Sequence, residues 1–316
     1  GCVIPMPLNH LWLAAFGSKP ASSCKEENFG KDIMRRFIKF TLFAFLGLLI
    51  LLAVLIGFTQ TRYFKGWLRD FAIEESASYI NGELQLGSID GNFFTNIRLN
   101  DLIVKDSFET LLQLPQLSVE YSPLQLLKGV IAVDSVSLDS LSLRLAQSSD
   151  SVWNISRLIK SEPDTAESSG FPFIVTVEDF HLKNARMTVS ALDSIIPQQI
   201  HDLTIRLSGQ YSDNEQTLDL KEFRLKTKQP DFELRELSFL FNGTESEMVL
   251  KNLKIQTGRN RVAGEGRYYP GDKQPSSAGL TSDPFDLREI DFMFPDFRIY
   301  GKPEIALRTT YYRDSL

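Results

Sequence analysis

Side chains that could carry out chemistry are few and widely spaced in this chain of 316 residues. The histidines are His10, His181 and His201, and the cysteines are Cys2 and Cys24. Catalytic and metal sites need such groups in recognisable patterns, and the sequence contains no H-E-x-x-H, G-x-S-x-G or Walker A motif. We therefore expect no enzyme activity, no catalytic residue, no metal site and no cofactor.

Four aspartates recur in the later part of the chain, at Asp101, Asp134, Asp139 and Asp179. Carboxylates can bind a cation when several of them converge on one point. These four are far apart in sequence, and each lies in a short polar stretch between apolar residues. We expect their side chains to cap bends of the backbone through hydrogen bonds. We expect His181, which alternates with apolar neighbours, to face solvent.

The overall charge excludes one class of partner. The chain has 34 Lys and Arg against 40 Asp and Glu, which gives a formal net charge of −6. A nucleic-acid-binding protein carries a basic patch or is basic as a whole, so we expect no nucleic acid as a partner. Apolar residues make up 43% of the chain, which is ample for a buried core and excludes wholesale disorder.

A long apolar run lies near the start of the chain, from Phe40 to Phe58. It contains no charge and no proline, and a helix of this length is roughly 29 Å long, close to the ~30 Å hydrocarbon layer of a bilayer. A buried core helix is the alternative, but such helices seldom lack polar side chains over this length. We predict a transmembrane signal-anchor over residues 37–59. It follows a tail over residues 1–36 that is disordered, or non-native before Met34.

The charges around this run predict its orientation. Cations before the run outnumber those after it, which places the N-terminus in the cytoplasm and the rest of the chain outside it. The run is not followed by a small-residue cleavage site, so we expect the anchor to remain uncleaved. The cations are Lys31, Arg35, Arg36 and Lys39 before the run, and Arg62, Lys65 and Arg69 after it.

Residues 60–82 have the spacing of an amphipathic helix. Phe64, Leu68 and Phe71 recur at intervals of four and three, with charged residues between them. Gly82 can end the helix in a left-handed conformation. Two roles are open: a plug or lid against the structure that follows, or a cap over its first apolar edge. We predict the cap.

From Glu83 onward apolar and polar residues alternate, which predicts strands. Pairs of alternating apolar residues are repeatedly separated by a step of three residues instead of two. Such a step turns the next apolar residues to the opposite face unless the chain bends or bulges there. The steps run from Leu99 to Leu102, Leu114 to Leu117, Val133 to Val136, Leu138 to Leu141, Val177 to Phe180, Leu220 to Phe223, Leu234 to Leu237, Leu250 to Leu253 and Leu287 to Ile290.

Long, bent strands with one continuous apolar face explain these steps. That face must be covered by a facing sheet, by closure into a barrel, or by curling of the sheet into a trough. The sequence offers few helices that could cover it. We predict a mainly β fold in which residues 83–316 form one elongated, curled, antiparallel-type sheet. This sheet encloses a groove and is incomplete at its C-terminus.

Two segments carry a family resemblance. They run from Gly91 to Asp106 (GNFFTNIRLNDLIVKD) and from Leu250 to Gly266 (LKNLKIQTGRNRVAGEG). After an anchor and a short helix, they resemble the N-terminal part of bacterial TamB and AsmA-like proteins, over residues 34–316. The resemblance implies a single-pass inner-membrane protein whose β-groove crosses the periplasm. It also implies phospholipid transport between the two membranes, outer-membrane protein assembly with a TamA-like barrel as partner, or both.

Two functions remain open for the apolar residues. If the groove is open, they bind phospholipid acyl chains, at about 0.8 kcal/mol per buried CH₂ group. If apolar faces bury each other, the same residues form the core of a membrane-tethered structural scaffold without a lipid path. The resemblance favours the open groove. The candidate lining residues are Ile97, Leu99, Leu102, Val104, Leu117, Val119, Val136, Leu138, Leu141, Leu143, Phe180, Leu182, Phe223, Leu225, Leu237, Phe239, Leu253 and Ile255.

Overall fold

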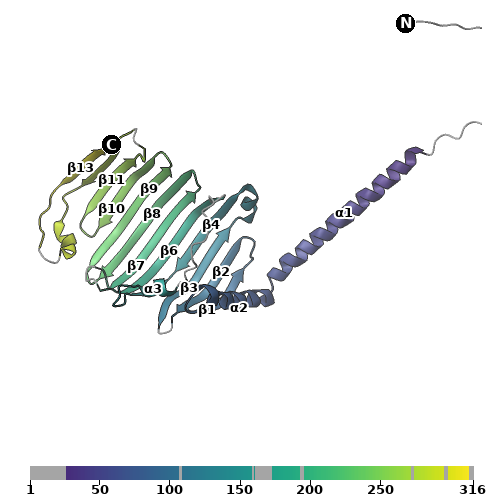
Figure 1. Cartoon of the computed structure of the whole chain (residues 1–316), viewed down its shortest axis with the longest axis horizontal. Helices are drawn as coiled ribbons and strands as arrows, with labels where there is room; N and C mark the ends of the chain where they lie inside the picture. Colours follow the sequence, from purple (N-terminus) through teal and green to yellow (C-terminus); the bar gives the residue numbers. More distant parts are fainter. Residues whose placement is uncertain are drawn as a thin grey trace, which may run out of the picture. The chain divides into compact units, whose positions relative to one another are not determined.

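The computed structural model describes residues 26–106, 109–158, 160, 173–192, 196–271, 274–294 and 298–312. His10 and both cysteines lie outside these residues. The chain divides into two compact units, one up to Ile56 and one from Gly57 onward. The first unit holds most of helix α1 (Glu26–Thr59), and the second holds helix α2 (Arg62–Tyr79) and the strands (Figure 1).

Helix α1 contains a stretch, Met34–Thr59, that is long and apolar enough to cross a membrane. It is the one such helix in the described part of the chain. Its side chains from Met34 to Phe58 are exposed, as expected of a helix surrounded by lipid rather than by a protein core. The helix begins at Glu26, earlier than the predicted boundary at residue 37, so the last part of the predicted tail is helical.

Helix α2 follows α1 after a short break at Thr61. The Thr61 hydroxyl accepts a hydrogen bond from the backbone N–H of Phe64 at 3.2 Å, which caps the start of the helix. The helix packs against strand β1 (Glu83–Gly91), which is the first edge of the sheet. The role of α2 as a cap over this edge stays a prediction.

The thirteen strands of the described residues form one sheet, in chain order from β1 to β13, with β5 lying beside β3 and β6. Neighbours are antiparallel, except that β4 and β5 run parallel to β6. A parallel pair needs a long connection, and here that connection includes helix α3 (Asn154–Leu158). The other strands are β2 (Asn96–Lys105), β3 (Thr110–Tyr121), β4 (Val130–Asp139), β5 (Ser142–Ala146), β6 (Ile174–Ser190), β7 (Gln199–Tyr211), β8 (Glu215–Lys228), β9 (Phe232–Thr244), β10 (Met248–Thr257), β11 (Arg261–Tyr268), β12 (Ser276–Ser282) and β13 (Ile305–Tyr311).

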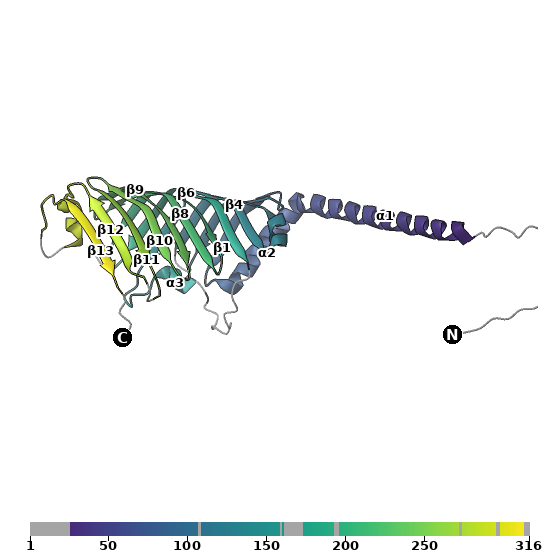
Figure 2. The same cartoon turned by 90° about the horizontal axis from the view of Figure 1, so that it is seen from above.

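The sheet curls, so that in the view from above the strands of one part cross those of another (Figure 2). Strands β1 and β13 are its two edges. All described strands belong to this sheet, and none of them forms a second layer against it. The predicted mainly β fold with a large curled sheet is therefore confirmed.

Most steps of three are bends of the backbone, and they take two forms. In the first form, the second residue of the polar pair adopts a left-handed conformation, which Asn and Asp tolerate better than most residues. Asp101, Ser140 and Asn184 do so, with φ values of 53°, 59° and 53°. They lie in one line across β2, the β4–β5 junction and β6, because the residues on either side of them are aligned by strand pairing.

In the second form, one strand carries an extra residue. Val177 pairs with Gly209 and Phe180 pairs with Leu207, so two residues of β6 face one residue of β7. Such a bulge moves the following side chains back to the original face. Both forms therefore keep the apolar residues of bent strands on one side of the sheet.

One predicted step is wrong. The residues from Leu287 to Ile290 lie in a short helix, η2 (Leu287–Met293), instead of a strand. Asp286 starts this helix, because its carboxylate accepts a hydrogen bond from the backbone N–H of Arg288 at 3.2 Å. Spacing alone cannot assign so short an apolar run to a strand or a helix.

Candidate functional site

The apolar residues of successive strands lie opposite one another in rows that cross the sheet. Directly paired residues point to the same face, so each row adds a continuous line of apolar side chains to that face. The central row extends from β1 to β8. Its members are Ile89, Leu99, Leu117, Leu138, Leu182, Ile205 and Phe223.

Similar rows lie on either side of the central row. Together with it they make one apolar face, which we call the apolar face of the sheet and which extends across β1–β9. On one side the row consists of Ile97, Val119, Val136, Phe180, Leu207, Leu220 and Phe239. On the other side lies a row made of Leu84, Val104, Leu112, Leu143, Met187 and Ile200.

The strands place sixteen of the eighteen predicted lining residues on this apolar face, and the other two, Leu253 and Ile255, lie on the next strand, β10. Ten of the eighteen lie in the central row and in the row of Ile97. Toward the C-terminal end, Leu237 pairs with Ile255, and Leu253 pairs with Gly264. Leu182 is buried and the other seventeen are half-buried. Because the described residues place no second layer over them, this partial burial comes from packing within the curled sheet.

The most buried part of the face is a cluster that the sequence predicted only in part. Its centre is Leu182, Ala185 and Leu203, of which Ala185 is only 1% exposed. Five predicted residues surround this centre, together with two that were not predicted, Ile200 and Ile205. The five predicted neighbours are Leu138, Leu141, Phe180, Phe223 and Leu225. Strand β7 repeats the step of three between Ile200 and Leu203, so its sequence contained the signal.

The opposite face is polar and carries His181, as predicted. His181 pairs with Arg206 of β7, and partial burial, followed by the nearby cations Lys183 and Arg206, lowers its pKa. The Arg206 guanidinium donates a hydrogen bond to the Asp179 carboxylate at 2.8 Å, which lowers the pKa of Asp179. These groups form a charged surface on this face of the sheet.

The other recurrent aspartates lie at bends of the backbone. Asp134 accepts a hydrogen bond from the Ser122 hydroxyl at 2.7 Å, and Asp139 accepts one from the Ser140 hydroxyl at 2.9 Å. Asp101 is itself a left-handed bend residue. Within the described residues, no three His, Cys, Asp or Glu side chains are grouped so that they could hold a metal ion.

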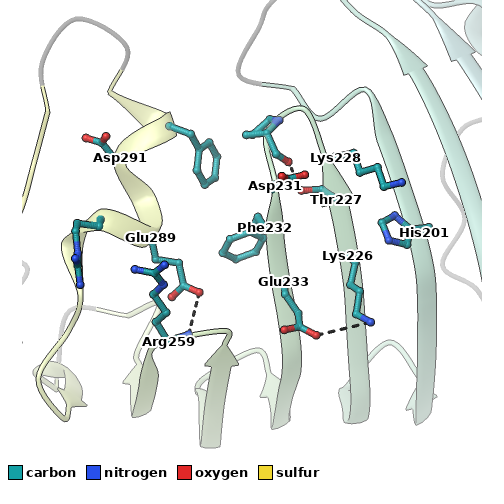
Figure 3. A pocket seen from close by; sticks show the side chains of 13 residues that line it. His201, Lys226, Thr227, Lys228, Asp231, Phe232, Glu233, Arg259, Glu289 and Asp291 are labelled. Carbon is teal, nitrogen blue, oxygen red and sulfur yellow. Dashed lines mark hydrogen bonds and ion pairs between the residues drawn. The ribbon is translucent and has the colours of Figure 1, made fainter.

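A pocket of about 730 Å³ lies between η2 and the ends of β8 and β9 (Figure 3). Phe232 and Phe292 contribute an apolar part, with ring centroids 5.9 Å apart. Charged side chains surround them, including Lys226 and Glu233, which form an ion pair at 3.9 Å. The sequence did not predict this pocket, because η2 was expected to be a strand.

A polar network anchors η2 to the loop between β10 and β11. The Asn260 amide, in a residue only 2% exposed, donates to the Asp286 carbonyl oxygen at 3.2 Å and to the Glu289 carboxylate at 2.6 Å. Its oxygen accepts the backbone N–H of Asp286 at 2.6 Å. The Arg288 guanidinium donates two hydrogen bonds to the Asp286 carboxylate, which holds the pKa of Asp286 far below its usual range.

The arrangement offers a large apolar contact surface and, at the ends of β8 and β9, a pocket of mixed charge. The apolar face can hold hydrocarbon, since burial of apolar area is its main source of binding energy. The pocket can hold a polar group. Together these features fit an amphipathic guest better than a small polar molecule.

The comparison with known families agrees with this architecture. A family model described as the AsmA family matches residues 34–257, which is more than half of the chain. This range covers the membrane-length stretch of α1 from Met34 and the strands β1–β10. No curated protein and no solved structure shows a significant match. The chain therefore belongs to the AsmA family, which confirms the AsmA-like part of the resemblance in its sequence.

Proposed function

We propose that this protein carries phospholipid acyl chains along the apolar face of its sheet, between the inner and outer membranes of a bacterium. Membership of the AsmA family and the apolar helix α1 together support an anchor in the inner membrane. The excess of cations before the anchor supports a cytoplasmic N-terminus and a periplasmic sheet.

The observation that carries this proposal is the continuity of the apolar rows. Strands lie about 4.8 Å apart, so a row that crosses seven strands is roughly 29 Å long, close to the hydrocarbon thickness of a bilayer. Each buried CH₂ group of a guest chain gains about 0.8 kcal/mol. Because each strand presents an equivalent apolar position to the next, a guest can move along the row while keeping most of its contacts.

A structural scaffold without a lipid path is the alternative. It requires the apolar face to be buried by another part of the protein. The half-buried state of the lining residues and the single-layered sheet support the lipid path instead.

We propose a second role, in outer-membrane protein assembly with a TamA-like barrel as partner. The resemblance to TamB suggests it.

Photocrosslinking in living bacteria tests the lipid path. A photoreactive amino acid at Leu138 or Phe239 should yield phospholipid adducts, because both positions lie on the apolar face. Ser137 and Ser238 are matched controls, since each is the neighbouring residue in the same strand and points to the polar face. Adducts at the first pair alone would support the proposal. Crosslinks at Leu138 and Phe239 to protein alone would favour the scaffold.

A further inference from the structure

Helix α2 exposes an aromatic stripe on the side that does not face β1. Tyr63, Trp67 and Phe71 recur every four residues, which places them on one side of the helix. All three are exposed, and Tyr63 is 77% exposed. Phe64, which points inward, is half-buried. A helix whose role was only to cap an edge strand would not need aromatic residues on its outer side.

A second exposed apolar group lies on the short helix η1 (Pro123–Lys128), between β3 and β4. Leu124 is 77% exposed and Leu127 is 87% exposed. The helix is closed by Gly129, whose φ of 74° favours glycine. Exposed apolar residues mark a contact site when several of them are grouped on one surface, whereas single ones do not.

These two groups lie at the same end of the sheet. The Gln60 side chain donates a hydrogen bond to the Asn92 carbonyl oxygen at 2.6 Å, in the loop between β1 and β2. In the same loop, the Phe93 ring lies 5.6 Å from that of Phe64, and the Phe93 carbonyl oxygen accepts a hydrogen bond from the Tyr121 hydroxyl at 2.5 Å. Tyr121 ends β3, directly before η1. The start of α2, this loop and η1 are therefore neighbours.

Chain length determines what lies next to this end of the sheet. The membrane-length stretch of α1 ends at Thr59, and α2 begins at Arg62. The three backbone steps from Thr59 to Arg62 span at most roughly 11 Å. The headgroup region of a bilayer is about 5–8 Å thick on each side of the hydrocarbon layer. If α1 spans the membrane, the first turn of α2 therefore lies at or near the headgroups.

The residue types suit this location. Tyr and Trp are the side chains enriched at membrane–water interfaces, and Leu can enter the outer part of the hydrocarbon layer. Arg62, Lys65 and Lys128 lie beside the exposed apolar residues and can contact anionic headgroups.

We propose that Tyr63, Trp67, Leu124 and Leu127 form a membrane-docking surface, which seats the β1 end of the sheet on the bilayer that α1 crosses. The occupant of this surface is a phospholipid headgroup layer rather than another protein. The proposal rests on α1 as a membrane anchor. It does not depend on lipid binding by the apolar face, because the two sets of residues are different.

Fluorescence in reconstituted vesicles tests the docking surface. The full chain, with Cys2 and Cys24 replaced by Ser, is inserted into vesicles of phosphatidylethanolamine and phosphatidylglycerol. Single cysteines at Leu127→Cys or Trp67→Cys carry an environment-sensitive dye. We expect a blue-shifted emission that nitroxide-labelled lipids quench. Leu307→Cys in β13 is the matched control, since Leu307 is 59% exposed at the other edge of the sheet, and we expect water-like emission without quenching there.

Two outcomes would overturn the proposal. Water-like emission at Leu127 and Trp67 would show that this end does not touch the bilayer. Blue-shifted emission without nitroxide quenching would show that protein, such as a second copy of the chain, covers these residues. Phospholipid crosslinks at Leu138 are measured on a different surface, so failure of the docking surface is distinguishable from failure of the lipid path.

Discussion

The middle of the sheet and its C-terminal end are held together in different ways. In the middle, β6 and β7 bury Leu182, Ala185 and Leu203 by packing side chains of one face against each other. At the C-terminal end, β11 carries glycines at positions that pair with β12, and most side chains of β13 are exposed. There, a polar network around Asn260 and Asp286 fixes η2 to the sheet.

This difference shows where the stability of a single-layered sheet comes from. Without a facing layer, bulky apolar residues can bury one another only by packing together on one face. A region with small residues must rely on hydrogen-bond networks, which are strong when every member has a partner. We therefore expect the two regions to respond differently to the same change.

The largest contrast should come from one substitution made in both regions. Leu182→Ala should lower the free energy of unfolding by about 2–5 kcal/mol, because it leaves a cavity in the central cluster. Leu307→Ala, at an exposed position in β13, should change it by less than about 0.5 kcal/mol. Urea unfolding of the full chain in detergent measures both values. Equal losses would show that the C-terminal end has a core of its own.

A smaller effect should come from the backbone bend in the middle region. Asn184→Val should cost about 1–2 kcal/mol, because a β-branched residue strongly disfavours the left-handed conformation at this position. Asn184→Gly should be close to neutral. Arg186→Val is the control, since Arg186 is exposed on the same strand without a positive φ. If Gly cost as much as Val, the Asn184 side chain, and not its backbone, would be the stabilising element.

The smallest effect should come from acidification, which should weaken the C-terminal end more than the middle of the sheet. Hydrogen bonds from Arg288 lower the pKa of Asp286 in the folded state below its ordinary value of 3.8. A carboxyl whose pKa is lower in the folded state than in the unfolded state stabilises the fold at pH values above its unfolded pKa. This stabilisation is lost as the pH falls through the folded pKa. Amide-exchange protection of β11–β13 should therefore stay constant from about pH 7 to 5.

Below about pH 4, protection in β11–β13 should fall while that in β6–β8 is less affected. Asp286→Asn should lower the amide-exchange protection of the C-terminal end at neutral pH. The further loss of protection there in acid should then be smaller. An unchanged acid response in Asp286→Asn would assign the effect to other carboxyls.

Much of the fold follows from local sequence signals. The uncharged run up to Phe58 predicts the apolar helix, and the steps of three predict bent strands with apolar residues on one face. Both signals depend on neighbouring residues only, and the rows through Leu138 and Phe180 agree with them. The predicted residues of these rows share a face because the backbone bends where the spacing of apolar residues changes from two to three.

Other features depend on contacts between distant segments. The parallel pairing of β4 with β6 is set by a long connection, which no local pattern encodes. Ala185, the most buried member of the cluster, carries a small side chain that is a weak signal in sequence. The anchor of η2 joins Asn260 to Asp286 across 26 positions, so neither residue could be identified from its own surroundings.

The line of left-handed residues through Asp101, Ser140 and Asn184 makes a crease in the sheet. Because the strands on either side of each bend are joined by hydrogen bonds, one strand cannot sharpen its angle unless its neighbours follow. The width of the trough is then a shared property of these strands. If the apolar face carries acyl chains as proposed, a bulkier guest should open the whole crease slightly instead of opening a gap at one point.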